Sequence, residues 1–377
     1  EDMLSCNFSE KIRLDVEVVT KRTMLSKIHS IYDVFGFFAP YVIRAKVLLQ
    51  RLWLEKVDWD DRLQGPVVIA FREWEAELPL LAEIIIPRWI PTSDKRTIQL
   101  QGFADASERA YGAMIYLRTV DMSGKVEISF VIAKTRVAPL KVVSLARLEL
   151  MAMHCLAKLC HYVMEAFQFK IDDVYLWSDS AIALAWVSKP STAWKTFVRN
   201  RVQEIHDLVS PTAWRHCSTT DNPADLLSRS ITLAELKNSK LYWQGPSWLR
   251  EGHDKWPKQS GKSVAAEGME KEVDGERAKM SVALITSNPV TDVIEEVTEK
   301  LEKFSKIVRV FAYVLRWKRI VQRRKACRLE NLEGSQSVVL SVTEVRDSER
   351  MLFRQVQRKC FPEEYFSMTR GRALKKD

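Results

Sequence analysis

The order of strand-like and helix-like segments between residues 97 and 229 is the feature that most restricts the fold. Three strand-like runs, at 98–104, 111–120 and 126–133, are joined by short polar turns. The segments after them are a helix at 144–167, a nearly all-apolar strand at 174–177, helices from 180 and at 194–208, a strand at 213–217 and a short helix from 222. A buried central strand in this order predicts an α/β fold with a sheet of mixed direction and flanking helices.

The rest of the chain divides by composition. A length of 377 residues is enough for two or three domains, and an apolar content of 46% is enough to form their cores. Before the sheet, a strand pair is expected within 1–20 and helices within 23–55, with Ser26 as a cap and Tyr32 on the buried stripe, and at 67–81. The predicted regions are helices at 1–95, an α/β domain at 96–231, an aromatic extension at 232–254, a disordered linker at 255–290 and a basic helical segment at 291–377.

Charge and cysteine content narrow the possible partners and the compartment. The net charge of +9 and the pI near 9.1 favour a polyanionic partner or a membrane surface. Six cysteines show no framework spacing, so we expect the reducing interior of a cell. The apolar run 34–43 is broken by Pro40 and is too short to span a bilayer. The chain starts with Glu-Asp-Met, and we interpret it as a fragment of a longer product.

Two acidic residues near the start of the α/β region stand in unusual settings. Asp105 lies at the end of the first strand, and its sequence neighbours are small residues that would let a metal ion approach. The same sequence is also common where a strand leads into a turn. Glu149 shares a helix face with Leu145, Ala152 and Leu156, the stripe that should meet the sheet. An ionised carboxylate there costs several kcal/mol unless it is paired or bound to metal. The alternative is a glutamate at the rim of the stripe that reaches water.

Two further aspartates follow later elements. Asp179 comes after the apolar run 174–177, and open α/β sheets bind ligands at the carboxyl ends of such strands. It could equally cap the helix from Ser180. Asp225 stands three residues after Asn222, with Pro223 between them, so it could be a member of a capping box.

The four carboxylates together predict a metal site. Converging without a cluster of cationic side chains, they would repel one another unless metal cations lay between them. Oxygen-only ligands suit Mg²⁺ or Mn²⁺ and not Zn²⁺. Two such ions can hold an attacking water and stabilise the leaving oxygen of a phosphodiester, so the chemistry expected is cleavage of a nucleic-acid backbone.

With these residues identified, the chain resembles the ribonuclease H domain of retroelement polyproteins. The matching pieces are Asp105-Ala-Ser, Leu-Glu149-Leu, Ser-Asp179-Ser and Asn222-Pro-Ala-Asp225-Leu-Leu-Ser-Arg. Residues 25–28, 32–36, 39–40 and 243–249 are similar to the Pao (BEL/Pao) class of LTR retrotransposons. The resemblance implies that 1–95 is the tail of a reverse transcriptase and that 291–377 leads into an integrase.

The resemblance also implies a substrate, a cofactor and partners. The substrate would be an RNA/DNA hybrid, cut with two Mg²⁺ or Mn²⁺ ions held by Asp105, Glu149, Asp179 and Asp225, with Asp221 as the alternative fourth ligand and His216 close by. The partners would be the remaining reverse transcriptase and integrase parts of the polyprotein, and no membrane would be involved. The protein would act inside the cell, in a cytoplasmic particle, with the nucleus as a second compartment. Candidate nucleic-acid contacts are Gln101, Ser107, Ser180, Asn222, Arg316, Lys318, Arg319, Arg323 and Arg324.

Other functions are weighed against the same residues. No Tyr or Phe precedes an Asp-Asp pair as a polymerase requires, and the position of the integrase glutamate is Arg215, so neither activity is expected. An aspartic peptidase, which the family's name has suggested, needs Asp-Ser/Thr-Gly, and neither Asp105-Ala-Ser nor Asp179-Ser-Ala fits. A catalytically inactive or domesticated module that binds nucleic acid through the basic helix 316–328 is the principal alternative. That helix could equally be a solvated charged surface.

Overall fold

The computed structural model describes residues 2–5, 18–92, 96–258, 270–278, 303–326 and 340–361, without the side chains of 270–272, 320–326, 358 and 359. The chain forms two compact units, Glu1–Met280 and Ser281–Asp377, which are described separately. Most of the strand pair predicted within 1–20 lies outside the described residues. The part that is described, β1 (Met3–Ser5), pairs antiparallel with β2 (Ile85–Pro87).

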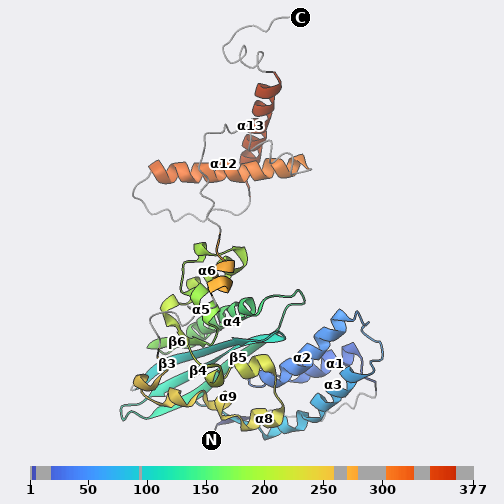
Figure 1. Ribbon diagram of the computed structural model, residues 1–377, viewed down its shortest axis with the longest axis vertical. Helices are drawn as coiled ribbons and strands as arrows, with labels where there is room; N and C mark the ends of the chain where they lie inside the picture. Colours follow the sequence, from blue (N-terminus) through green and yellow to red (C-terminus); the bar gives the residue numbers. More distant parts are fainter. Residues whose placement is uncertain are drawn as a thin grey trace, which may run out of the picture. The chain divides into compact units, whose positions relative to one another are not determined.

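A five-stranded mixed sheet is the centre of the first unit, in the order β5-β4-β3-β6-β7 (Figure 1). The strands are β3 (Thr97–Ala106), β4 (Ala110–Val120), β5 (Val126–Val137), β6 (Asp173–Ser178) and β7 (Trp214–His216). The first three form an antiparallel meander, β6 runs parallel to β3, and β7 runs parallel to β6. The predicted α/β class and mixed sheet are therefore confirmed.

One face of the sheet is covered by the longest helix of the unit. Helix α4 (Leu145–Ala166) begins after Ser144 and packs its apolar stripe on β3 and β4. A Cβ at Gly102 would lie 2.7 Å from Leu156 Cδ1, so a glycine is needed for this close approach. Helices α5 (Ala181–Val187) and α6 (Thr196–Leu208) complete this layer.

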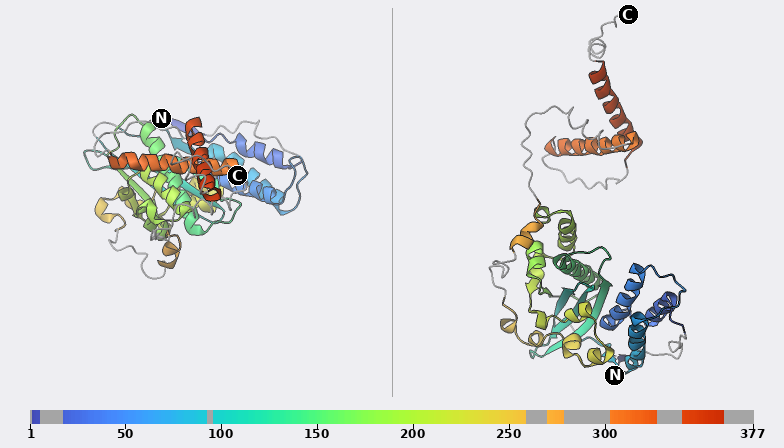
Figure 2. Two further views of the ribbon diagram at one scale, coloured as in Figure 1. Left: turned by 90° about the horizontal axis from the view of Figure 1, so that it is seen from above. Right: turned by 45° about the vertical axis from the view of Figure 1, so that its right-hand side comes forward.

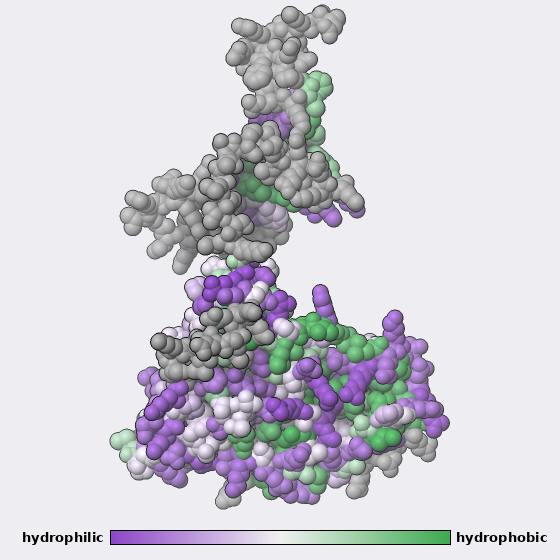
Figure 3. All heavy atoms as spheres, in the orientation of Figure 1, coloured by the Kyte–Doolittle hydropathy of each residue, from purple (hydrophilic) through white to green (hydrophobic). Residues whose placement is uncertain are grey.

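The opposite face is covered by the aromatic extension. Helices α8 (Leu233–Asn238) and α9 (Lys240–Gln244) bring Tyr242 onto the sheet, where its carbonyl accepts a 2.6 Å hydrogen bond from the Tyr116 hydroxyl. Trp177 of β6 packs against Trp248, with ring centroids 4.7 Å apart. The face of this unit seen in Figure 3 carries hydrophilic residues with apolar patches among them. The largest fully buried side chains include Trp74, Trp177 and Trp186.

Three helices precede the sheet and lie beside its β5 edge (Figures 1 and 2). They are α1 (Lys21–Ser30), α2 (Ala39–Leu54) and α3 (Pro66–Ala76). Their buried side chains, such as Tyr41 and Trp74, belong to the same apolar core as Phe103 and Trp177 of the sheet. The helices and the sheet therefore bury one continuous core.

Two details of the predicted helices are wrong. Thr20, and not Ser26, caps α1: it forms a capping box with Thr23, and Ser26 lies inside the helix. Helix α1 ends at Ser30, so Tyr32 leaves the helical stripe and is 87% exposed. The helix starts at the residue whose hydroxyl accepts a hydrogen bond from Thr23 N, and the spacing of apolar residues alone does not reveal this start.

The segment 33–38 anchors the helices to the sheet. The Asp33 carboxylate accepts hydrogen bonds from the backbone N–H groups of Phe37 and Phe38, each 2.8 Å long. The carbonyl of Phe35 accepts a 2.8 Å hydrogen bond from Ala133 N on the edge strand β5. Gly36 has φ of +72°, and a Cβ there would lie 1.9 Å from the Ala133 carbonyl oxygen. Only glycine fits this contact.

Replacing Gly36 with alanine is expected to destabilise the first unit by more than about 3 kcal/mol, because backbone strain and a backbone clash add together. Gly65 is the matched control: its φ is +74°, but nothing lies within 4 Å of a Cβ there. Gly65→Ala should cost about 1–3 kcal/mol from strain alone. The measurement is urea unfolding of both variants, and an equal loss would contradict the role assigned to the Ala133 contact.

Parts of the predicted linker 255–290 are ordered. Helix α10 (Glu270–Gly275) is followed by an isolated bridge between Arg277 and Trp194, and Arg147 pairs with Glu276 at 2.6 Å. Residues 259–269 and 279–290 lie outside the described part of the chain.

The second unit contains α12 (Phe304–Ala326) and α13 (Val342–Cys360). Ile307, Phe311 and Leu352 form its small buried cluster. Among the described helices of either unit, none has the length and apolar character needed to cross a membrane.

Candidate metal centre

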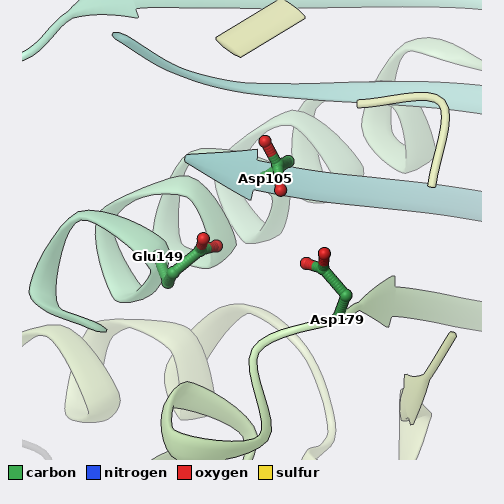
Figure 4. A group of neighbouring side chains, drawn as sticks. All are labelled: Asp105, Glu149 and Asp179. Carbon is green, nitrogen blue, oxygen red and sulfur yellow. The ribbon is translucent and has the colours of Figure 1, made fainter. Parts of the chain in front are cut away.

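Three of the predicted carboxylates come together at one end of the sheet. Asp105 lies one residue before the end of β3, and Asp179 directly follows the neighbouring parallel strand β6. Glu149 projects toward them from the second turn of α4 (Figure 4). One carboxylate oxygen from each residue lies within 4.8 Å of the others. Parallel neighbours end at the same edge, which is why residues far apart in sequence meet here.

The alternatives to a shared site do not hold for two of these residues. Glu149 is only 8% exposed, so it does not reach water from the rim of the helix. The cap of α5 is Ser180, whose side chain accepts a 3.3 Å hydrogen bond from Ala183 N, so Asp179 is not the cap. Glu149 therefore does not face water, and Asp179 does not cap a helix; both carboxylates belong to the cluster.

Crowding and burial perturb the acidity of the cluster. Burial, together with the negative charges of Asp179 and Asp225, raises the pKa of Asp105 to about 7, although a hydrogen bond from Ser228 opposes the rise. Burial, followed by the charges of Asp105 and Asp179, raises the pKa of Glu149 to about 9. Protein groups alone therefore do not stabilise all three carboxylates in the ionised form.

The donor set fits a hard divalent cation. Glu149 Oε2 is buried and has no hydrogen-bond partner among the described residues. Ligand oxygens around one Mg²⁺ lie at about 2.1 Å from the ion, and so at most about 4.2 Å from one another. The observed separations need only small side-chain movements to reach that range. All three ligands are carboxylates, which suits Mg²⁺ or Mn²⁺.

Asp225 and Asp221 border this cluster without joining it. Asp225 begins α7 (Asp225–Arg229), and its Oδ1 accepts a 2.6 Å hydrogen bond from Arg229. Burial raises the pKa of Asp225. The charge and hydrogen bond of Arg229 lower this pKa, and the negative charge of Asp179 raises it further. Asp221 accepts a 3.0 Å hydrogen bond from the Ser218 hydroxyl. The negative charge of Asp225 contributes to the raised pKa values of Asp105 and Glu149. The choice between Asp225 and Asp221 as the fourth ligand stays a prediction.

Two side chains that sequence reasoning did not assign to this role position the carboxylates. The buried Ser228 hydroxyl donates a short hydrogen bond to Asp105 Oδ2. The buried Asn222 amide donates to the Ala104 carbonyl at 3.0 Å and to Asp179 Oδ1 at 3.4 Å. Ser228 follows Asp225 by three residues on the same short helix, so the two share a helix face. This spacing was the one feature of the sequence that placed Ser228 near the carboxylates.

Four predicted nucleic-acid contacts have other environments. Gln101 and Asn222 are fully buried, and Gln101 accepts a 2.9 Å hydrogen bond from Trp177, so neither side chain is accessible to a ligand. The Ser107 hydroxyl donates to the Ser228 carbonyl at 2.8 Å, and Ser180 caps α5. Gln101 and Asn222 were candidate contacts because they are polar and lie near the carboxylates in sequence, and neither property reveals burial.

His216 and Cys217 lie next to the centre. His216 ends β7 and pairs with Ser178, the residue before Asp179. Cys217 is buried, and burial with the nearby carboxylates raises the pKa of its thiol. The thiol is therefore protonated and serves as apolar packing.

The basic helix of the second unit is partly neutralised. Arg316 forms a bidentate pair with Glu344, with its Nε at 2.6 Å from Oε1, and Arg319 pairs with Asp347 at 2.6 Å. Lys318 is exposed. The side chains of Arg323 and Arg324 lie outside the described set. For Arg316 and Arg319, binding to phosphates would compete with these ion pairs.

Comparison with known proteins identifies the class of domain. Residues 20–180 match the family model described as "Pao retrotransposon-like RNaseH-like domain", a range that includes Asp105, Glu149 and Asp179. Among solved structures, RNase H1 from the halophilic archaeon Halobacterium salinarum NRC-1 is 20% identical over 35% of this chain and 95% of that chain, with a TM-score of 0.23. No curated protein matches the chain. Residues 20–180 of this chain are therefore similar to the Pao retrotransposon-like RNaseH-like family.

Proposed function

We propose that this chain is part of a retrotransposon polyprotein and hydrolyses the RNA strand of RNA/DNA hybrids. The observation that carries the proposal is the meeting of Asp105, Glu149 and Asp179 at the carboxyl edge of the sheet, with a buried Glu149 oxygen that lacks a partner among the described residues. The family match over 20–180 supports the same class of chemistry.

The three carboxylates would hold the metal, with Asp225 at the border as the fourth. Bound Mg²⁺ or Mn²⁺ ions would supply Lewis acidity toward the scissile phosphate and lower the pKa of the attacking water. Ser228 holds Asp105, and Asn222 holds Asp179 to the end of β3, so the ligand geometry is fixed before substrate arrives. Preorganised ligands of this kind lower the cost of reorganisation during the reaction.

The test is cleavage of matched substrates by the purified chain. A labelled RNA/DNA hybrid, the corresponding DNA duplex and the corresponding RNA duplex are incubated with Mg²⁺ and, separately, with EDTA. We expect cleavage of the RNA strand in the hybrid alone, and only with the metal. Equal cleavage of all three duplexes, or cleavage in EDTA, would contradict the proposal.

A further inference from the structure

A second feature of the first unit is a cleft of about 800 Å³ between the helices that precede the sheet and the sheet itself. Its walls come from α1, α2 and the segment between them, from the outer edge of β5, and from α4 and α6. Gly36 and Ala133, which form the close backbone contact, both line it. The cleft therefore exists because the helices are anchored at the edge strand.

The lining of the cleft is strongly basic. It includes five cationic side chains, and Asp33 is its one carboxylate among the described residues. Both oxygens of Asp33 already accept backbone hydrogen bonds. The five cations are Lys46, Lys134, Arg136, Lys158 and Arg201.

Two of these cations are available for a ligand. Lys134 and Arg136 are exposed on β5, and neither forms an ion pair with a described residue. Lys158 shares Glu204 with His154, at 3.1 and 2.7 Å. Lys134, Arg136 and Lys158 line the same cleft, together with Cys155. Such a concentration of positive charge favours a polyanion.

The cleft lies at the same end of the sheet as the carboxylates. Asp105 pairs with Gly112, and Gly112 pairs with Thr135, which is flanked by Lys134 and Arg136. Neighbouring strands are about 4.8 Å apart, so the backbone at Thr135 is roughly 10 Å from that at Asp105. A nucleic acid held at Asp105 has a phosphate backbone long enough to cover this distance.

We propose that this cleft binds the phosphate backbone of the nucleic acid whose scissile bond lies at Asp105, Glu149 and Asp179, which rests on the proposed function. Lysine and arginine side chains contact phosphates without reading the sequence. The two tyrosines of the lining differ in exposure: Tyr111 is buried and Tyr162 is exposed. One exposed tyrosine ring gives a small platform for base stacking beside five cationic side chains. The contact is therefore mainly electrostatic, and it should weaken steeply with salt.

The test measures binding and not cleavage. The Kd of a labelled RNA/DNA hybrid is determined in EDTA at several salt concentrations for the wild type and for Lys134→Glu/Arg136→Glu. We expect Kd to rise at least roughly tenfold at about 0.1 M salt, and the slope of log Kd against log salt to fall by up to about 2, because each lost phosphate contact removes about 0.9. Lys134→Gln/Arg136→Gln should show the same direction with a smaller effect.

The matched control carries the same change of charge on another face. Lys240 of α9 and Lys255, which directly follows the aromatic extension, are exposed and do not line the cleft. Lys240→Glu/Lys255→Glu should change Kd much less. Equal effects of the two charge-reversed variants, or no effect at Lys134 and Arg136, would overturn the proposal, as would the absence of hybrid binding by the wild type.

The outcome separates this inference from the proposed function. Hybrid binding that depends on Lys134 and Arg136 without any cleavage in Mg²⁺ would support the cleft and refute the nuclease. Hybrid cleavage by the wild type, with a Kd that is unchanged in the Lys134 and Arg136 variants, would support the nuclease and refute the cleft. Thermal melting of each variant verifies that the fold is retained.

Discussion

Replacing Asp179 with asparagine is expected to lower kcat/KM for hybrid cleavage by roughly 10³-fold. The carboxylate follows β6 and lies within 4.8 Å of oxygens from Asp105 and Glu149. Its loss removes a charged metal ligand, and metal ions contribute several kcal/mol of transition-state stabilisation. About 4 kcal/mol corresponds to a factor of roughly 10³ in rate. The measurement is steady-state cleavage of a labelled hybrid in saturating Mg²⁺.

Asp173 provides the control for this variant because it lies at the opposite end of the same strand. Its carboxylate is exposed and accepts a 3.2 Å hydrogen bond from Gln99. Asp173→Asn should leave the rate within about threefold, as expected for a surface substitution away from the site. The Asp179 variant should melt no lower than the wild type, since it removes one charge from a crowded cluster. Retention of more than a tenth of the activity in Asp179→Asn would rule out its place as a ligand.

Without metal, the first unit should lose stability as the pH rises from about 4 to about 9. In the unfolded chain, Asp and Glu titrate near pH 4. In the folded chain, the pKa of Asp105 is raised to about 7 and that of Glu149 to about 9. The folded state thus holds protons that unfolding releases, so this contribution is full below about pH 4 and disappears as the pH passes each folded pKa. The expected loss is a few kcal/mol.

Melting temperatures measured in EDTA across pH 5–9 provide the check. Glu149→Gln should make the melting temperature fall less steeply with rising pH, because the glutamine side chain does not ionise. Glu73→Gln, which changes an exposed residue of α3, should leave it unchanged. Mg²⁺ should raise the melting temperature more at pH 8.5 than at pH 6, since binding requires deprotonated carboxylates. A decline of equal slope in the wild type and in Glu149→Gln would exclude the buried glutamate as its source.

The carboxylates were predictable because each broke a local rule. Glu149 interrupts an apolar helical stripe, and Asp179 follows an apolar strand, so the sequence itself marks both as out of place. The succession of strands and helices along the chain was predictable from the same patterns, because β3 to β5 are long and joined by short turns.

The residues that hold the carboxylates were not predictable in the same way. Ser228 and Asn222 act on partners more than 40 positions away in the chain, and their local sequence describes only a helix start. Tyr32 was predicted to be buried and is exposed, and the candidate contact Gln101 is buried, because burial depends on packing between distant elements. The basic cleft has no sequence signature, since its walls come from helices and strands that are far apart in the chain.

The shared core of helices and sheet has a consequence for how this region can be shortened. A polypeptide beginning at residue 96 would leave Phe130 and Tyr242 without their neighbours on α2 and the 33–38 segment, where the Tyr242 hydroxyl now donates to the Phe37 carbonyl at 3.0 Å. Uncovered aromatic surface of this size promotes aggregation. The sheet and the helices before it should therefore unfold in a single cooperative transition, and a shortened fragment that contains the sheet would have to retain the chain from about residue 18 onward.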